Sequence, residues 1–87
     1  MYKIVFTKTA DKHKRLLKQA GLEIKARGLL NIIRKNPFKS PPSVETLRGD
    51  LSGYYSRRIN RQHRLVYTVD EDQNIVKVIS MWTHYEA

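Results

Sequence analysis

A carboxylate, an imidazole and several guanidinium groups stand out in this sequence for the chemistry they could perform together. Glu45 precedes a segment that contains Arg58 and Arg64, and His84 follows it. The carboxylate could remove a proton, the imidazole could donate one, and a guanidinium could stabilise charge that develops on a phosphate between them. Cleavage of RNA without a metal ion needs this set, because the neighbouring 2′-hydroxyl is the nucleophile.

The arginines of this set lie in segments that alternate as β-strands do. Ser56 and Arg58 share one face of the first segment, and Arg64 begins one face of the second. Guanidinium groups that project from adjacent strands could surround one phosphate. Charge alone favours the alternative of a solvated basic face. Glu45 could likewise be a plain surface residue, and His84 could belong to a chain end with no task.

Other ring side chains are expected to be structural. His63 has the strand parity of Leu65 and Tyr67, which predicts a buried or hairpin-closing histidine rather than a catalytic one. His13 falls on a helical apolar stripe and is interpreted as a packing residue. Trp82 could stack on a base, but we favour a place against the core.

The charge of the chain favours an anionic partner. Its 87 residues hold 17 Lys and Arg against 8 Asp and Glu, which gives a formal net charge of +9. Nucleic acid is the first candidate for such a partner. Most of the excess charge lies in residues 1–50. A further group of basic side chains lies in the segment 54–69, without an acid among them: Arg57, Arg58, Arg61 and Arg64.

The length and the cysteine count exclude several classes of protein. Residues 1–87 are enough for one domain, with one hydrophobic core. Because the sequence has no cysteine, it has no disulfides, no thiolate nucleophile and no cysteine-based metal site. The histidines are too scattered for a metal cluster, and we expect no cofactor. No stretch approaches the ~20 apolar residues that span a bilayer, and residues 1–8 lack the apolar core of a signal peptide. We therefore expect a soluble cytoplasmic protein with no membrane partner.

The hydrophobic pattern predicts an α+β fold. A helical half and a strand half are separated by a loop that contains all the prolines, at positions 36–42. Thr7 or Thr9 could cap the first helix, and Gly21 could end it. Short polar links between the later strands predict an antiparallel meander. The expected segments are a strand at 2–6, helices at 10–20 and 22–33, and strands at 44–48, 54–59, 63–69 and 75–82. We expect the N-terminal strand and the two-helix hairpin to pack on a twisted antiparallel sheet.

Several short motifs in combination resemble a known family. They extend over nearly the whole chain and are Asn36-Pro37-Phe38, Glu45, Leu51-Ser52-Gly53, Ser56-Arg57-Arg58-Ile59, His63-Arg64-Leu65-Val66-Tyr67 and His84-Tyr85. Together with the length and the order of elements, they look like the YoeB/Txe branch of the RelE superfamily of toxins. The resemblance implies a RelE-like, microbial-ribonuclease-like fold.

The resemblance also implies an activity and a role for each residue. The family cleaves mRNA in the A site of the 70S ribosome without a metal ion, which leaves a 2′,3′-cyclic phosphate and a 5′-hydroxyl. By this resemblance Glu45 is the general base, His84 the general acid, and Arg64 the cation that stabilises the transition state. Arg58 holds phosphate. Arg48 takes the place of a basic residue that contacts substrate, and Tyr85 helps to position the substrate.

The resemblance further implies partners for the chain. Members are held inactive by a YefM-type antitoxin and often form homodimers, while ribosomal RNA and mRNA are the nucleic-acid partners. Two alternatives stay open: a non-catalytic toxin of the same fold, like the ParE branch that poisons gyrase, and an RNA-binding or ribosome-binding module. The combination of Glu45, Arg64 and His84 favours the enzyme, because ParE-like chains lack it.

Overall fold

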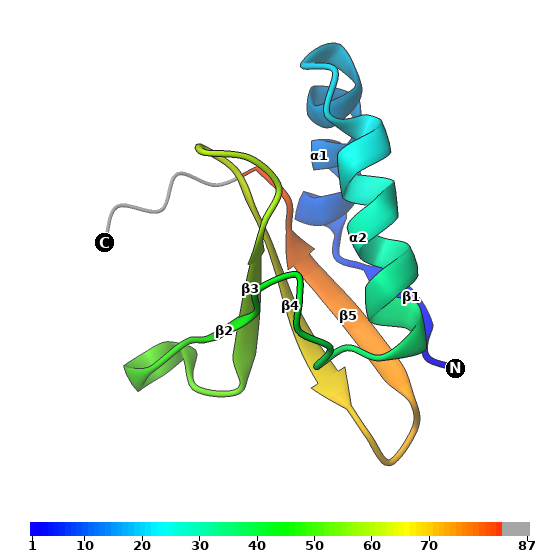
Figure 1. Cartoon of the computed structure of the whole chain (residues 1–87), viewed down its shortest axis with the longest axis vertical. Helices are drawn as coiled ribbons and strands as arrows, with labels where there is room; N and C mark the ends of the chain where they lie inside the picture. Colours follow the sequence, from blue (N-terminus) through cyan, green and yellow to red (C-terminus); the bar gives the residue numbers. More distant parts are fainter. Residues whose placement is uncertain (83–87) are drawn as a thin grey trace.

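Two helices and five strands make up most of residues 1–82, the part of the chain that the computed structural model describes (Figure 1). The elements are β1 (Lys3–Phe6), α1 (Lys8–Gln19), α2 (Glu23–Lys35), β2 (Glu45–Thr46), the 3-10 helix η1 (Gly49–Leu51), β3 (Tyr54–Arg58), β4 (Arg64–Asp70) and β5 (Ile75–Ser80). They follow the predicted order closely. The largest difference is β2, which has 2 residues where the sequence predicts a strand over 44–48.

The strands form one mixed sheet with the order β1-β5-β4-β3-β2. The predicted antiparallel meander is confirmed, because β2, β3, β4 and β5 each pair antiparallel with the next. The sheet is not wholly antiparallel, however, since β1 pairs in parallel with β5. The long connection between these two strands, which includes both helices, permits a parallel pairing that a short turn could not make. The α+β class is therefore confirmed. The expectation of a wholly antiparallel sheet is wrong for β1, which is parallel to its neighbour β5.

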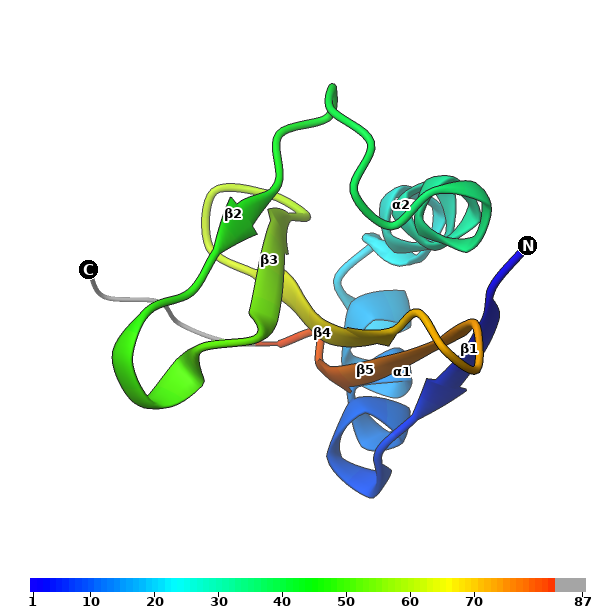
Figure 2. The same ribbon diagram turned by 90° about the horizontal axis from the view of Figure 1, so that it is seen from below.

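Both helices lie on the side of β1 and β5, while β2 and η1 extend away from them (Figures 1 and 2). Thr7 fixes the start of α1, because its hydroxyl accepts a hydrogen bond from the Ala10 amide and donates one to the Ile79 carbonyl of β5. Gly21 has φ 73° and makes the turn between the helices, a left-handed conformation that favours glycine. Within residues 1–82, no helix has the length and apolarity to cross a membrane.

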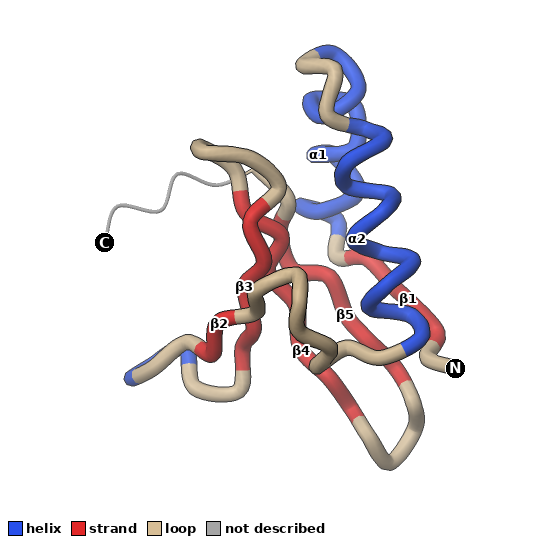
Figure 3. The backbone as a smooth tube through the Cα atoms, viewed as in Figure 1, coloured by secondary structure: helices blue, strands red, loops and turns tan. Residues whose placement is uncertain are grey.

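The core lies between the helices and the sheet. Ala10 and Leu17 from α1 and Ala26 and Ile33 from α2 face the sheet. The sheet contributes Leu65, Tyr67, Val76 and Val78, and Ile59 and Met81 complete the cluster from adjoining loops. In Figure 3 the loop that follows α2 crosses to β2 at the outer edge of the sheet. This loop carries the chain to Glu45.

Arg57 holds this loop against the sheet. Its side chain is completely buried, and its guanidinium donates to the carbonyl oxygens of Pro37, Lys39 and Pro42 at 3.1, 2.8 and 2.7 Å. Its Nε donates to the Tyr67 hydroxyl, which in turn donates to the Pro37 carbonyl. Burial raises the pKa of Tyr67, and Arg57 opposes this shift. The buried arginine therefore determines the path by which the loop enters β2.

Candidate active site

Strand pairing brings Glu45, Arg58 and Arg64 to one face of the sheet. Glu45 of β2 is paired with Ser56 of β3, and Arg58 of β3 is paired with Arg64 of β4. Because side chains two residues apart in a strand share a face, Ser56 and Arg58 point the same way, and their partners across the ladder point with them. The register thus places one carboxylate and two guanidinium groups together, as the alternation predicts for the arginines.

The side-chain contacts agree with this register. Arg64 Nη1 lies 3.3 Å from Glu45 Oε1, an ion pair, and 3.4 Å from the Ser56 hydroxyl. The Arg64 side chain is 18% exposed and that of Glu45 is 58% exposed. The arginine is therefore held by the sheet, whereas the carboxylate is open to solvent and to an incoming molecule.

These side chains line a small hollow on the surface. Its volume is about 320 Å³, and it is lined by Ser43, Glu45, Arg58 and Arg64. An anionic group in the hollow would meet two guanidinium groups, and a hydroxyl beside it could give its proton to Glu45. The hollow can therefore bind a phosphate and also supply a base beside it.

The structure separates the arginines of the segment 54–69 into different roles. Arg58 and Arg64 line the hollow, and Arg61 lies in the exposed turn after β3. Arg57, which the sequence analysis grouped with them, is buried on the other face of the sheet. Arg57 lies on the same face of β3 as Tyr55, opposite to the face of Ser56 and Arg58. The alternation in the sequence therefore already separates Arg57 from Arg58.

The remaining expected site residues lie elsewhere or outside the described part. Arg48 is exposed and immediately precedes η1, and it does not line the hollow formed by the described residues. His84 and Tyr85 lie outside the described residues. Ser43 and Ser56 contribute to the site although the sequence analysis gave them no role. Ser56 shares the parity of Arg58, but Ser43 lies in a loop and has no comparable signal.

The two histidines that were expected to be structural have structural contacts. His63 is 3% exposed, and its carbonyl accepts hydrogen bonds from the amides of Ile59 and Asn60, which close the β3–β4 turn. His13 Nδ1 accepts the amide hydrogen bond of Met81 at 3.0 Å. Burial lowers the pKa of His13, with a smaller contribution from the charge of His63. Trp82 packs against the core, as favoured from the sequence.

Comparison with known proteins agrees with the sequence motifs. A family model, described as YoeB-like toxin of bacterial type II toxin-antitoxin system, matches residues 6–85. A protein called Toxin YoeB from Synechocystis is 45% identical over 73 residues, which are 84% of this chain and 76% of the relative.

Solved structures show the same fold. The YoeB/ParE toxin from Agrobacterium tumefaciens has a TM-score of 0.86 and 32% identity, over 95% of this chain and 99% of the other. In a YoeB-YefM complex from Staphylococcus aureus, a chain with 38% identity has a TM-score of 0.81 over 98% of this chain and 99% of its own. YoeB of the same organism, solved as a dimer, has 38% identity and a TM-score of 0.82 over 97% and 98% of the two chains.

Proposed function

The chain belongs to the family of YoeB-like toxins of bacterial type II toxin-antitoxin systems, and on this premise we propose that it is an endoribonuclease that cleaves mRNA in the ribosomal A site. The observation that carries this proposal is the hollow in which Arg64 Nη1 lies 3.3 Å from Glu45 Oε1 and Arg58 stands opposite Arg64. This arrangement unites a solvent-accessible base with cations suited to a phosphodiester.

The proposed reaction is an internal transfer followed by departure of the 5′-oxygen. Glu45 removes the proton of the 2′-hydroxyl, whose oxygen attacks the adjacent phosphorus. The bond from phosphorus to the 5′-oxygen breaks as His84 gives that oxygen a proton. The products are a 2′,3′-cyclic phosphate and a 5′-hydroxyl, and no metal ion is required by these steps. Arg64 stabilises the additional negative charge on the phosphate in the transition state.

The other residues bind the substrate in this scheme. Arg58 lines the same hollow as Arg64 and holds the phosphate before reaction. Arg48 lies on the exposed chain beyond β2, where it contacts a more distant part of the RNA. Tyr85 positions the substrate beside His84. The large positive charge of residues 1–50 guides the protein to ribosomal RNA and makes binding weaken as salt increases.

We also propose the partners that regulate this activity. The Staphylococcus aureus relative has been solved in a YoeB-YefM complex and as a YoeB dimer. By analogy, a YefM-type antitoxin neutralises this chain, and the free toxin forms a homodimer. An mRNA substrate on the ribosome requires that the protein act in the cytoplasm.

Mapping mRNA ends after brief expression tests the proposal directly. New 5′-hydroxyl ends should accumulate within reading frames, and the upstream fragments should end in 2′,3′-cyclic phosphate. Blocking translation initiation should abolish the ends, because the cleavage needs a ribosome. Growth arrest with every mRNA intact would contradict the proposal and would favour the non-catalytic toxin.

A further inference from the structure

The chain immediately beyond β5 is held by a side chain of α1. The pairing of β5 with β4 extends as far as Ser80, which lies opposite Val66. Met81 follows and is 1% exposed, and its amide donates to Nδ1 of His13 at 3.0 Å. A buried amide costs free energy when it has no acceptor. His13 therefore supplies to Met81 the hydrogen bond that a neighbouring strand supplies inside the sheet.

The sequence of α1 places His13 within reach of this amide. Ala10 and Leu17 are the buried residues of the helix. His13 lies three residues after the first and four before the second, so it shares the face that packs on the sheet. Thr7 fixes the start of α1 against β5, because its amide and its hydroxyl each donate to a carbonyl group of that strand. The position of His13 along β5 is thereby set.

The protonation state of His13 suits this contact. An imidazole accepts at Nδ1 only when it is neutral and carries its proton on Nε2. Burial lowers the pKa of His13, and the charge of His63 lowers it further. At neutral pH the ring is therefore in the form that the hydrogen bond to Met81 requires.

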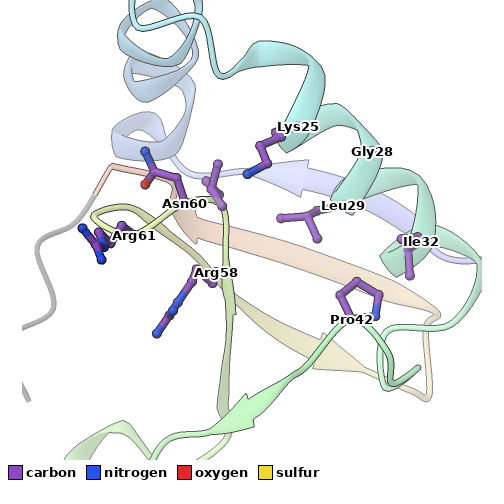
Figure 4. A pocket seen from close by; sticks show the side chains of 9 residues that line it. Lys25, Gly28, Leu29, Ile32, Pro42, Arg58, Asn60 and Arg61 are labelled. Atoms are coloured by element: carbon purple, nitrogen blue, oxygen red, sulfur yellow. The ribbon is translucent and has the colours of Figure 1, made fainter.

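The next residue, Trp82, is held by a different part of the fold. Its indole stacks on the imidazole of His63. The turn between β3 and β4 fixes His63, whose amide donates to Oδ1 of Asn60 at 2.7 Å. Figure 4 shows Asn60 in this turn, beside a hollow of about 540 Å³ that lies between the turn and α2. Two successive residues, Met81 and Trp82, are thus attached to α1 and to the turn before β4.

We propose that His13 is a positioning residue for the general acid and acts through Met81 and Trp82. His84 is two residues beyond Trp82 in the sequence. An extended chain advances at most about 3.6 Å per residue, so the place of Trp82 limits the space that His84 can reach. A fixed starting point favours the conformations in which an acid meets the leaving oxygen. The inference rests on the proposed function in taking His84 as the general acid.

The first measurement is the rate of cleavage on ribosomes that carry mRNA. His13→Leu removes the acceptor and retains an apolar side chain. Its kcat should fall by roughly tenfold to a hundredfold, because displacement of a reacting group by about 1 Å has an effect of this size. Its KM for the programmed ribosome should stay within about twofold of the unaltered value, since the substrate contacts are unchanged. His13→Asn, which keeps an acceptor near the position of Nδ1, should restore kcat.

Two further variants separate positioning from a general loss of stability. Ala10→Gly weakens α1 on the same buried face, and it should lower stability to urea without slowing cleavage. In a chain that already carries His84→Ala, His13→Leu should cause no further fall in kcat. A residue that acts only by placing His84 has no effect once that imidazole is gone.

The fluorescence of Trp82 reports on the segment directly, because the sequence contains one tryptophan. His13→Leu should shift the emission to longer wavelength and increase its quenching by acrylamide, as the indole leaves its stack. His13→Asn should retain the emission of the unaltered chain.

Each outcome decides the inference. An unchanged kcat or an unchanged emission from a folded His13→Leu chain overturns it, as does an equal fall in kcat with and without His84, or from Ala10→Gly. If His13→Leu does not fold, His13→Asn is compared with His13→Gln, whose amide lies one carbon further from the backbone, and equal rates overturn the inference. If the unaltered chain cleaves no mRNA, the proposed function is refuted, and the emission of Trp82 decides whether His13 holds this segment.

Discussion

The His63 imidazole stacks on the Trp82 indole, with ring centroids 3.7 Å apart and an interplanar angle of 17°. The two rings belong to chain segments that flank different strands of the sheet. His63 immediately precedes Arg64, the first residue of β4, and Trp82 follows the end of β5. In the sequence Trp82 is two positions before His84. The stack therefore joins the residue before β4, the strand that begins with Arg64, to the segment that precedes His84, the proposed general acid.

Trp82→Ala should lower the stability of the fold. Removal of the indole abolishes the stack and exposes core residues, which should lower the free energy of unfolding by about 2 kcal/mol. Urea denaturation followed by circular dichroism measures this loss. Trp82→Phe, which retains an aromatic ring over His63, should recover most of it. Equal destabilisation by the two variants would show that stacking contributes little.

Glu45→Gln should abolish most cleavage with little change in stability. The amide keeps the size of the side chain but cannot accept the 2′-hydroxyl proton, so the rate should fall by roughly 10²-fold or more. Because Glu45 is largely exposed, loss of its ion pair with Arg64 should cost less than about 1 kcal/mol. Asp50→Asn makes the same chemical change in exposed η1 and should cleave at the unaltered rate. Cleavage is measured from the yield of new mRNA 5′ ends per unit time.

Arg64→Lys should slow cleavage although it preserves the charge. A lysine ammonium lacks the planar fork that can bind two phosphate oxygens while also contacting Ser56. A loss of about 10²-fold in rate is expected for removal of a transition-state donor. Arg15→Lys, at an exposed position of α1, is the matched control. A full rate from Arg64→Lys would reduce the role of this residue to that of a simple positive charge.

Arg57→Met should be far more harmful to folding than the same change at Arg58. The loss of Arg57 leaves the Lys39 and Pro42 carbonyls without this donor and the Pro37 carbonyl with only the Tyr67 hydroxyl, in a partly buried region. A cost of roughly 3 kcal/mol or more is expected. Arg58→Met, on the exposed face, should change the unfolding free energy by less than about 0.5 kcal/mol. Thermal unfolding of the two variants gives the comparison, and similar melting temperatures would contradict the clamp assigned to Arg57.

His13 should make stability decline in mild acid. Its pKa is lowered in the folded protein, chiefly by burial, and the neutral ring accepts the Met81 amide hydrogen bond. The stability that this neutral form contributes is present above the ordinary pKa of about 6.5 and is lost as the pH falls through the folded value. His13→Asn keeps an acceptor near the position of Nδ1 and does not titrate there. Urea unfolding across this range should show a shallower pH dependence for the variant, and identical slopes would exclude His13 as a cause.

The sequence predicts those parts of the site that depend on local alternation. The period of two residues places Ser56 with Arg58 and Arg64 with Val66, and the observed register joins the two pairs. Glu45 could not be placed in this way, because β2 is too short for a period to be visible. Its position depends on the contacts of the preceding loop with Arg57. Those contacts involve carbonyl groups, which every residue possesses and no sequence pattern marks.

The parallel pairing of β1 with β5 was equally inaccessible to local reasoning. The apolar alternation of residues 2–6 predicts a strand but contains nothing about its partner or its direction. That partner lies about seventy residues further along, as in the pairing of Lys3 with Ile75. The hollow between α2 and the turn after β3 could not be predicted either, because its walls come from segments far apart in the sequence. Pairings between distant segments emerge from packing of the whole domain.

The pairing of β1 with β5 also sets a time at which this protein can become harmful. Synthesis proceeds from the N-terminus, so β1 and both helices leave the ribosome well before β5 exists. The sheet cannot be completed until the chain has been made through Ser80, because β5 separates β1 from β4. During synthesis β1 therefore lacks β5, the strand with which it pairs in the folded protein. A chain still in synthesis therefore lacks the complete sheet for most of the translation of its message.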